Sequence, residues 1–285
     1  MNVTTLPQDP SAHRAELDEA VALLSQALAE LPADAQAVTG GALRDRVLQR
    51  VGRSAARHRG MLTVRRSHPP PEPIAPGVQR RWLHRAADAA ALRPGEPVWL
   101  AIVELAPGAR LMQGLALAGG GSEWLVLRGA LRLESLSLGT LDHHRRAASD
   151  DEPLLVAGEE GALVYLRHSG AQVARSATSR ADGAAWEEFA PGIRRRILWQ
   201  EGTEVGYLAR AVEGATVPSH GHRHDEECLM LEGELFLGDI LIREGDFQLA
   251  PAGRVHGLVQ AASDCMVYIR GDAELAFDLG EPQAA

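Results

Sequence analysis

The sequence lacks lysine altogether, has only two cysteines and is poor in aromatic residues. All 29 basic residues are arginine, and aromatic residues make up 4% of the chain. The two cysteines, Cys228 and Cys265, are too few for a disulfide framework, and no CxxC motif is present. No apolar run reaches the ~18 residues of a membrane span, and the first residues lack the basic and apolar regions of a signal peptide. We therefore expect a reduced, cytoplasmic protein with no membrane partner.

Charge and length narrow the class of protein further. The net charge of −9 at pH 7 argues against direct binding of nucleic acid, whose phosphates attract basic proteins. The hydrophobic fraction of 45% is ordinary for a globular protein with a buried core. The 285 residues suffice for two domains or one large one.

The first 64 residues are predicted to form a short α-helical N-terminal segment. Apolar residues recur at three- and four-residue spacing over residues 11–31, and again over residues 42–59. Two helices of this size bury little surface alone, so we expect them to pack on the rest of the chain or on a partner. Five prolines in the fourteen residues from 65 to 78 then predict an extended linker over residues 65–80.

Beyond the prolines, short apolar runs alternate with Gly, Pro and Asp, which predicts a mainly β structure. This part of the chain also repeats itself. LVLRGAL around Gly129 resembles LMLEGEL around Gly233, and VYLR at residue 164 resembles VYIR at residue 267. The two landmarks are 35 residues apart in the first copy and 34 in the second. We therefore predict two related β domains, at residues 81–180 and 181–285.

Histidines and acids gather in the second copy, in the stretch GATVPSHGHRHDEECLMLEG. In an extended strand, His220 and His222 project from the same face, and Glu226 lies far enough along to return from the next strand. His256 follows a turn rich in Gly and Pro and is well placed to supply a distant donor. Imidazole and carboxylate groups that converge in this way are typical metal ligands. The alternative is a solvated polar loop, which would explain neither His256 nor the glycine spacing.

These residues resemble the cupin superfamily. The pattern G-x5-H-x-H-x3-E-x6-G is met at Gly214, His220, His222, Glu226 and Gly233. The pattern G-x5-P-x-G-x2-H-x3-N is met at Gly245, Pro251, Gly253 and His256, with Gln260 in place of the asparagine. The resemblance implies two tandem jelly-roll barrels, the second with His220, His222, Glu226 and His256 around one divalent metal ion. Zinc is the first choice, and iron, manganese, nickel or cobalt remain open.

Three neighbours of these ligands are expected to lie outside the metal shell. His224 has no place in the motif and is predicted to be a loop residue. Strand alternation sends the Glu227 carboxylate to the opposite face, where we expect it to be exposed. Cys228 returns to the ligand side and is expected to be a small buried hydrophobe, with a thiol packed beneath the metal as the alternative.

The first copy does not keep the motif. Between Gly108 and Gly129 it has no histidine and retains only Glu123, with Gln113 near the place of the first histidine. His143 and His144 occur later without the expected turn, and we predict them to be surface residues. The first barrel is therefore expected to hold no metal.

Within the superfamily, HGHRHDEECLMLEG is similar to the cupin domain of ChrR-type anti-sigma factors. Residues 186–215 fit the same group, and residues 42–51 resemble the segment that precedes this domain. The resemblance implies a sensor or regulator in a transcriptional stress response, with an ECF-type sigma factor or another protein bound by the N-terminal helices. In the family a zinc site with a CxxC pair grips the sigma factor, whereas residues 1–64 contain no cysteine.

The alternative is a metal-dependent enzyme with an open coordination position for a small molecule. Fe(II) would favour oxidoreductase chemistry of the dioxygenase kind, and Zn or Ni would favour isomerase or hydrolytic chemistry. An enzyme also needs a proton carrier beside the metal, and only Gln248 and Gln260 stand out among the apolar strands. This favours the regulator. A purely structural metal and a homodimer are left open.

Overall fold

The computed structural model describes residues 46–52, 54, 58, 60–86, 97–111, 120–147, 154–169, 175–183 and 185–277. The chain divides into two compact units, Met1–Arg59 and Gly60–Ala285. In the first unit, residues 46–52 are helical, within the helix expected over residues 42–59; the helix expected over residues 11–31 lies outside the described residues. Among the described helical residues, none form a helix long and apolar enough to cross a membrane.

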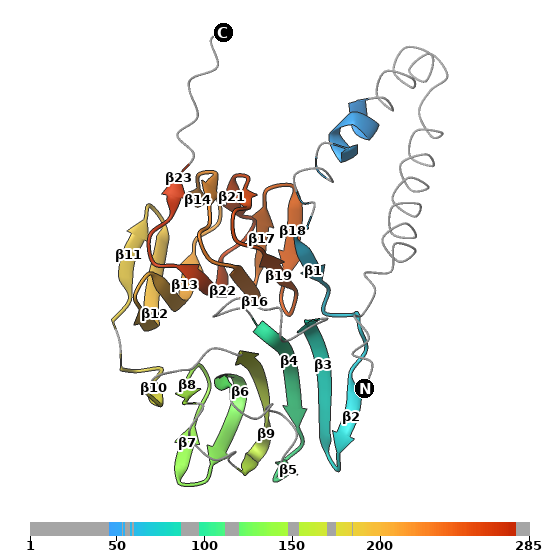
Figure 1. The fold of residues 1–285 in the computed structure, drawn as a ribbon, viewed down its shortest axis with the longest axis vertical. Helices are drawn as coiled ribbons and strands as arrows, with labels where there is room; N and C mark the ends of the chain where they lie inside the picture. The colour runs from blue at the N-terminus through green and yellow to red at the C-terminus, as the bar shows by residue number, and fades with distance from the viewer. Residues whose placement is uncertain are drawn as a thin grey trace. The chain divides into compact units, whose positions relative to one another are not determined.

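The first half of the second unit is a nine-stranded antiparallel sheet, which forms the first barrel (Figure 1). Its path is β10-β8-β6-β9-β4-β3-β2, with β5 paired to β9 and β7 paired to β6. The strands are β2 (Glu72–Ala75), β3 (Val78–Arg85), β4 (Pro97–Leu105), β5 (Arg110–Leu111), β6 (Gly121–Leu133), β7 (Leu136–Leu138), β8 (His143–Arg146), β9 (Leu155–Ser169) and β10 (Ala177–Ser179).

The second half repeats this arrangement in three sheets. A seven-stranded sheet runs β1-β19-β16-β22-β13-β12-β11, and the others run β14-β21-β17-β18 and β20-β15-β23. Its strands begin with β1 (Leu62–Val64), β11 (Glu187–Ala190), β12 (Ile193–Glu201), β13 (Glu204–Ala211), β14 (Thr216–Val217), β15 (His220–Gly221) and β16 (Glu226–Glu232). They continue with β17 (Glu234–Leu237), β18 (Ile240–Arg243), β19 (Phe247–Ala250), β20 (Val255–His256), β21 (Val259–Ala261), β22 (Cys265–Asp272) and β23 (Ala276–Phe277).

The repeat predicts two related β domains and the resemblance implies jelly-roll barrels, and this mainly β fold class is confirmed. The linker predicted from the prolines over residues 65–80 differs from the structure. β2 and the first residues of β3 lie within residues 65–80, and β2 pairs with β3. Residues 72–75 and 78–80 of the stretch expected to be a linker are therefore strands of the first barrel. Proline is tolerated there because β2 is an edge strand, where one face of the ladder needs no N–H donor.

The two barrels exchange their leading strands. β1 precedes the first barrel in sequence but pairs with β19 of the second, with Thr63 opposite Gln248. β10 precedes the second barrel but pairs with β8 of the first, with Thr178 opposite His144. Each barrel is thus completed by a strand from the segment that leads into the other, which ties the two halves into one unit.

Each barrel has its own apolar core. A third apolar cluster lies between the two barrel interiors and contains residues of both halves. It includes Leu100, Leu125 and Tyr165 of the first barrel and Phe247 and Tyr268 of the second, all at 0% exposure. Strand alternation explains this cluster: one face of each sheet fills its own barrel, and the other face packs against the neighbouring barrel.

Two arginines at matching positions cross this interface in opposite directions. Arg81 on β3 donates to the carbonyl of Gly245 in the second barrel at 3.1 Å. Arg196 on β12 donates to the carbonyl of Leu141 in the first barrel at 3.1 Å. Both guanidinium groups are buried, so the interface is held by polar contacts as well as by apolar packing.

Candidate metal centre

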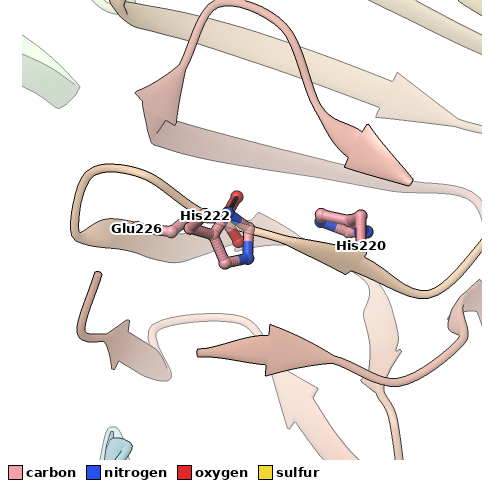
Figure 2. A group of neighbouring side chains, drawn as sticks. All are labelled: His220, His222 and Glu226. Atoms are coloured by element: carbon pink, nitrogen blue, oxygen red, sulfur yellow. Dashed lines mark ion pairs between the residues drawn. The ribbon is translucent and has the colours of Figure 1, made fainter. Parts of the chain in front are cut away.

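Three short strands of the second barrel carry the candidate ligands. β15 pairs with β20 so that His220 stands directly opposite His256. Glu226 opens β16 on the far side of the turn that follows His222. Figure 2 shows the side chains of His220, His222 and Glu226 gathered within the barrel.

The four side chains converge. One ligand atom each of His220, His222 and Glu226 lies within 4.8 Å of the others. Nε2 of His256 lies 3.1 Å from Oε1 of Glu226, and Nδ1 of His222 lies 3.3 Å from Oε2 of the same carboxylate. The ring of His256 is centred 5.7 Å from that of His220 and 4.8 Å from that of His222. All four residues are buried, so the cluster is not a solvated polar loop.

Backbone contacts hold these rings in place. Nδ1 of His220 donates to the carbonyl of Pro218 at 2.8 Å, so that the neutral form of this imidazole carries its lone pair on Nε2. Ser219 donates to the carbonyl of His256 at 2.7 Å, and the amide of Gly253 donates to the carbonyl of His222 at 2.8 Å. The turn thus fixes the donors relative to one another before any ion arrives.

The charges of the site are poised to receive a cation. Burial alone would raise the pKa of Glu226, but the nearby His222, His256 and His220 outweigh it and hold this pKa well below its usual range. Burial lowers the pKa of His222 in spite of the Glu226 charge, which keeps its imidazole in the neutral form that binds metals.

The cluster also leaves polar atoms unsatisfied. Within the described part of the chain, Nε2 of His222 and Nδ1 of His256 have no hydrogen-bond partner, and the other nitrogen of each ring has only its contact with the Glu226 carboxylate. Buried polar groups are rarely left unpaired, because the lost hydration is not recovered. A divalent cation among the four donors would recover it, and three imidazoles with one carboxylate suit zinc and the neighbouring transition metals.

Comparison with known proteins agrees with this site. Residues 174–273 match the family model described as the ChrR Cupin-like domain. The second barrel is a ChrR-like cupin domain. The anti-sigma-E factor ChrR of Cereibacter sphaeroides is 30% identical over 100 residues, which cover 35% of this chain and 47% of the relative. The chain thus matches about half the length of this curated relative.

Solved structures extend the likeness over both barrels. An oxalate decarboxylase variant from Bacillus subtilis covers 75% of this chain and 78% of its own, with 16% identity and a TM-score of 0.55. The protein YlbA from E. coli covers 75% of this chain and 93% of its own, with 11% identity and a TM-score of 0.56. At these identities the likeness shows the fold alone.

His224 lies outside the donor cluster, as expected. Its Nε2 is 2.8 Å from the hydroxyl of Thr203, and its Nδ1 is 3.2 Å from a carboxylate oxygen of Glu204. The side chain is 31% exposed. These contacts direct the ring toward the turn between β12 and β13.

Cys228 of the ChrR-like cupin domain is buried, as expected, and contacts the site directly. Its thiol donates to Oε1 of Glu226 at 3.4 Å. Burial, together with the Glu226 charge, raises the pKa of this thiol well above its ordinary value. The cysteine therefore stays protonated and supports the glutamate as a hydrogen-bond donor.

The prediction that Glu227 is exposed was wrong, since its side chain has 0% exposure. The strand alternation was right, because Glu227 does project away from the interior that receives Glu226. That opposite face is covered by the first barrel: the hydroxyl of Tyr165 donates to Oε2 of Glu227 at 2.6 Å, and Nε of Arg167 donates to Oε1 at 2.9 Å.

Glu123 of the first barrel corresponds to Glu227 and not to the candidate ligand Glu226. Glu123 pairs with Arg167 on β9, just as Glu227 pairs with Arg270 on β22. The position of the ligand is taken by Ser122, whose hydroxyl is 3.3 Å from Nδ1 of the buried His168. No metal-binding cluster is found among the described residues of the first barrel; Gln113 lies outside the described residues.

The prediction that His143 is a surface residue was also wrong. His143 is 2% exposed, and its Nε2 lies 3.5 Å from Oε2 of Glu123. It occupies β8, whose face toward the second barrel is covered. His144, the next residue along, is half-buried, and its Nδ1 is 2.9 Å from the hydroxyl of Thr178 on the exchanged strand β10.

Sequence reasoning missed one polar side chain of the barrel interior. Tyr207 on β13 is buried among the apolar residues of the second barrel. Burial and, next, the charge of Glu226 raise the pKa of this phenol well above its ordinary value. The alternation of GYLARAV places Tyr207 on the inward face with Ala209. The sequence pattern could therefore have predicted that Tyr207 points into the barrel.

Proposed function

We propose that this chain is a metal-binding regulatory protein whose ChrR-like cupin domain holds one divalent cation. His220, His222, Glu226 and His256 would be the ligands. The observation that carries the proposal is the convergence of these four buried donors, with one ring nitrogen each of His222 and His256 left without a hydrogen-bond partner among the described residues. A bound ion would neutralise the carboxylate and stabilise the folded domain, because the ligands are assembled only in the folded chain.

The proposed partner is a sigma factor of the ECF type or a protein that plays a similar part. Support comes from the relative, whose name describes an anti-sigma-E factor, and from the match over residues 174–273. We assign the binding surface to the helical segment within residues 1–64. Leu48 on this helix is 47% exposed, so its side chain is accessible to a partner.

Metal content of purified protein tests the first part. We expect one equivalent of zinc or a neighbouring transition metal per chain, and its loss in His256→Ala. His224→Ala is the matched control, because it removes a histidine from the same region that lies outside the donor cluster. Retention of full occupancy in His220→Ala and His256→Ala would contradict the ligand assignment.

Co-purification with a sigma factor of the same host tests the second part. Leu48→Asp in the full chain should abolish the complex, whereas Gln49→Asp, an exposed polar neighbour, should leave it intact. A complex that survives Leu48→Asp would remove the helix as the binding surface. The point substitution is preferable to deletion of residues 1–64, since that deletion would also remove β1 from the sheet of the second barrel.

A metal-dependent oxidoreductase is the second candidate function, and Tyr207 is the observation that favours it. Because its pKa is raised, the Tyr207 phenol stays protonated and could donate a hydrogen bond to a small molecule bound beside Glu226. Oxygen uptake by Fe(II)-loaded protein supplied with enediol compounds would test this candidate. Turnover in the wild type that falls in Tyr207→Phe with metal retained would favour the enzyme over the regulator.

A further inference from the structure

Four charged residues are buried together between the two barrels. Arg167 and Glu123 come from the first barrel and Arg270 and Glu227 from the second, and none is more than 3% exposed. Nε of Arg167 is 2.9 Å from Oε1 of Glu227, and NH1 of Arg167 is 3.7 Å from Oε1 of Glu123. Arg270 lies 3.7 Å from Glu123 and 3.9 Å from Glu227. We call these four residues the interface charge cluster.

The tightest contacts of this cluster meet at Glu227. Both of its carboxylate oxygens accept hydrogen bonds from first-barrel side chains, Oε1 from Arg167 at 2.9 Å and Oε2 from Tyr165 at 2.6 Å. Glu226, the candidate ligand, is the preceding residue on the same strand and projects to the other face. The strand at this point is therefore held by the first barrel on one side and by the histidines on the other.

The contacts of Glu227 restrain the backbone next to Glu226. A buried carboxylate cannot leave its partners without a large desolvation cost, so the backbone at Glu227 is restrained. Gly271 on the adjacent strand leaves room for Glu226, since a Cβ there would stand 3.3 Å from its Cγ. Groups that hold a ligand side chain in position raise the affinity of a site for its metal. Restraint of the backbone at Glu227 should therefore affect metal binding by Glu226.

We propose that Arg167 is a positioning residue for the metal centre. Through Glu227 it fixes the part of β16 that carries Glu226, so the barrel without metal ligands contributes to metal affinity in the other. This inference rests on the proposed metal site of the second barrel. It gives the first barrel a role in metal affinity although this barrel supplies none of the proposed ligands.

The competing explanation is that the interface charge cluster only holds the barrels together. The chain offers a matched control for it in Arg196. That residue is also buried and crosses the same interface, where it donates to the carbonyls of Leu141 and Ala181. No contact joins it to Glu227 among the described residues. Loss of Arg196 should weaken the interface without moving the ligand strand.

The test compares Arg167→Met with Arg196→Met in the full chain. Zinc affinity is measured by competition with a chromophoric chelator, and the ligand field by the visible absorption of the Co(II) form. Arg167→Met should weaken zinc binding about tenfold, as loss of an orienting partner does elsewhere, and should alter the Co(II) bands. Arg196→Met should lower the unfolding temperature but leave affinity within about twofold, because it shares no partner with the ligands.

Tyr165→Phe keeps the test decisive if Arg167→Met does not fold. It removes one hydrogen bond to Glu227 with almost no change in volume. We expect a smaller loss of zinc affinity, about threefold, and a shift of the Co(II) bands in the same direction. Wild-type affinity and an unchanged Co(II) spectrum in Tyr165→Phe, and in Arg167→Met where it folds, would overturn the proposal.

These outcomes are separate from failure of the metal site itself. If wild-type protein binds no metal, or if His220→Ala retains it, the proposed function fails before the interface variants are compared. If wild-type protein binds one equivalent that His220→Ala loses, the site stands, and only the interface variants decide the role of Arg167.

Discussion

The two barrels share one backbone plan but fill the corresponding positions differently. Where the second barrel has Glu226 facing Gly271, the first has Ser122 facing His168. His168 occupies space that the glycine leaves open, and its ring stacks on Trp99 at 5.6 Å between centroids. The comparison teaches that corresponding positions of a repeated β scaffold can hold converging imidazole and carboxylate groups in one barrel and packed side chains in the other.

The two barrels also differ at a buried position on the strands that carry Ser122 and Glu226. Trp124 of the first barrel corresponds to Cys228 of the second, and both are buried. A tryptophan fills the first interior, whereas the small thiol leaves room for the carboxylate it supports. The same strand position thus holds a large packed ring in one barrel and, in the other, a thiol that donates to the carboxylate of the candidate ligand Glu226.

The largest effect is expected for Trp124→Ala. Truncation of a buried aromatic side chain leaves a cavity, and we expect a loss of about 3–5 kcal/mol in the free energy of unfolding. Metal content should not change, because the first barrel supplies no ligand. Urea unfolding and elemental analysis of the same preparation check both statements, and a loss of metal in folded Trp124→Ala protein would break the comparison.

Cys228→Ala should have a smaller effect of a different kind. The cost in unfolding free energy should be about 1 kcal/mol, since a small side chain and one weak hydrogen bond are lost. Zinc affinity should fall by about a factor of a few, because Glu226 loses an orienting donor. Chelator competition measures the affinity. An affinity equal to wild type would show that the thiol only packs.

The smallest effect concerns pH, and it separates the interface from the metal site. Burial alone would raise the pKa of Glu123, but His143, Arg167 and Arg270 hold it well below the usual range. A depressed carboxyl pKa gives stability that is complete above the unfolded value of about 4.3 and is lost as pH falls toward the folded value. Metal-stripped wild type should therefore lose stability more steeply than Glu123→Gln between about pH 5 and 3. Parallel urea midpoints for the two proteins would refute this.

The motif spacing could place the four candidate ligands because each lies in or beside a tight local turn. The two-residue spacing of His220 and His222 and the turn before His256 are short-range features, and the structure brings all four side chains together. That they bind metal stays a prediction. Glu227 could not be placed in this way, because its burial depends on Tyr165 and Arg167 of the other barrel.

The exchange of β1 and β10 was hidden from the sequence for a related reason. A three-residue strand has almost no periodic signal, and Leu62 finds its partner Leu249 far along the chain. The structure has the two copies of the repeat. When LVLRGAL is aligned with LMLEGEL, Glu123 corresponds to Glu227 and not to Glu226. A strict count back from Gly129 and Gly233 would have shown this.

Anomalous diffraction from crystals grown with zinc tests the asymmetry of the two barrels most directly. The account predicts one strong zinc peak per chain, bounded by His220, His222, Glu226 and His256, and none near Ser122 and His168. A peak in the first barrel, or a zinc ion in the second that leaves His256 uncoordinated, would contradict it.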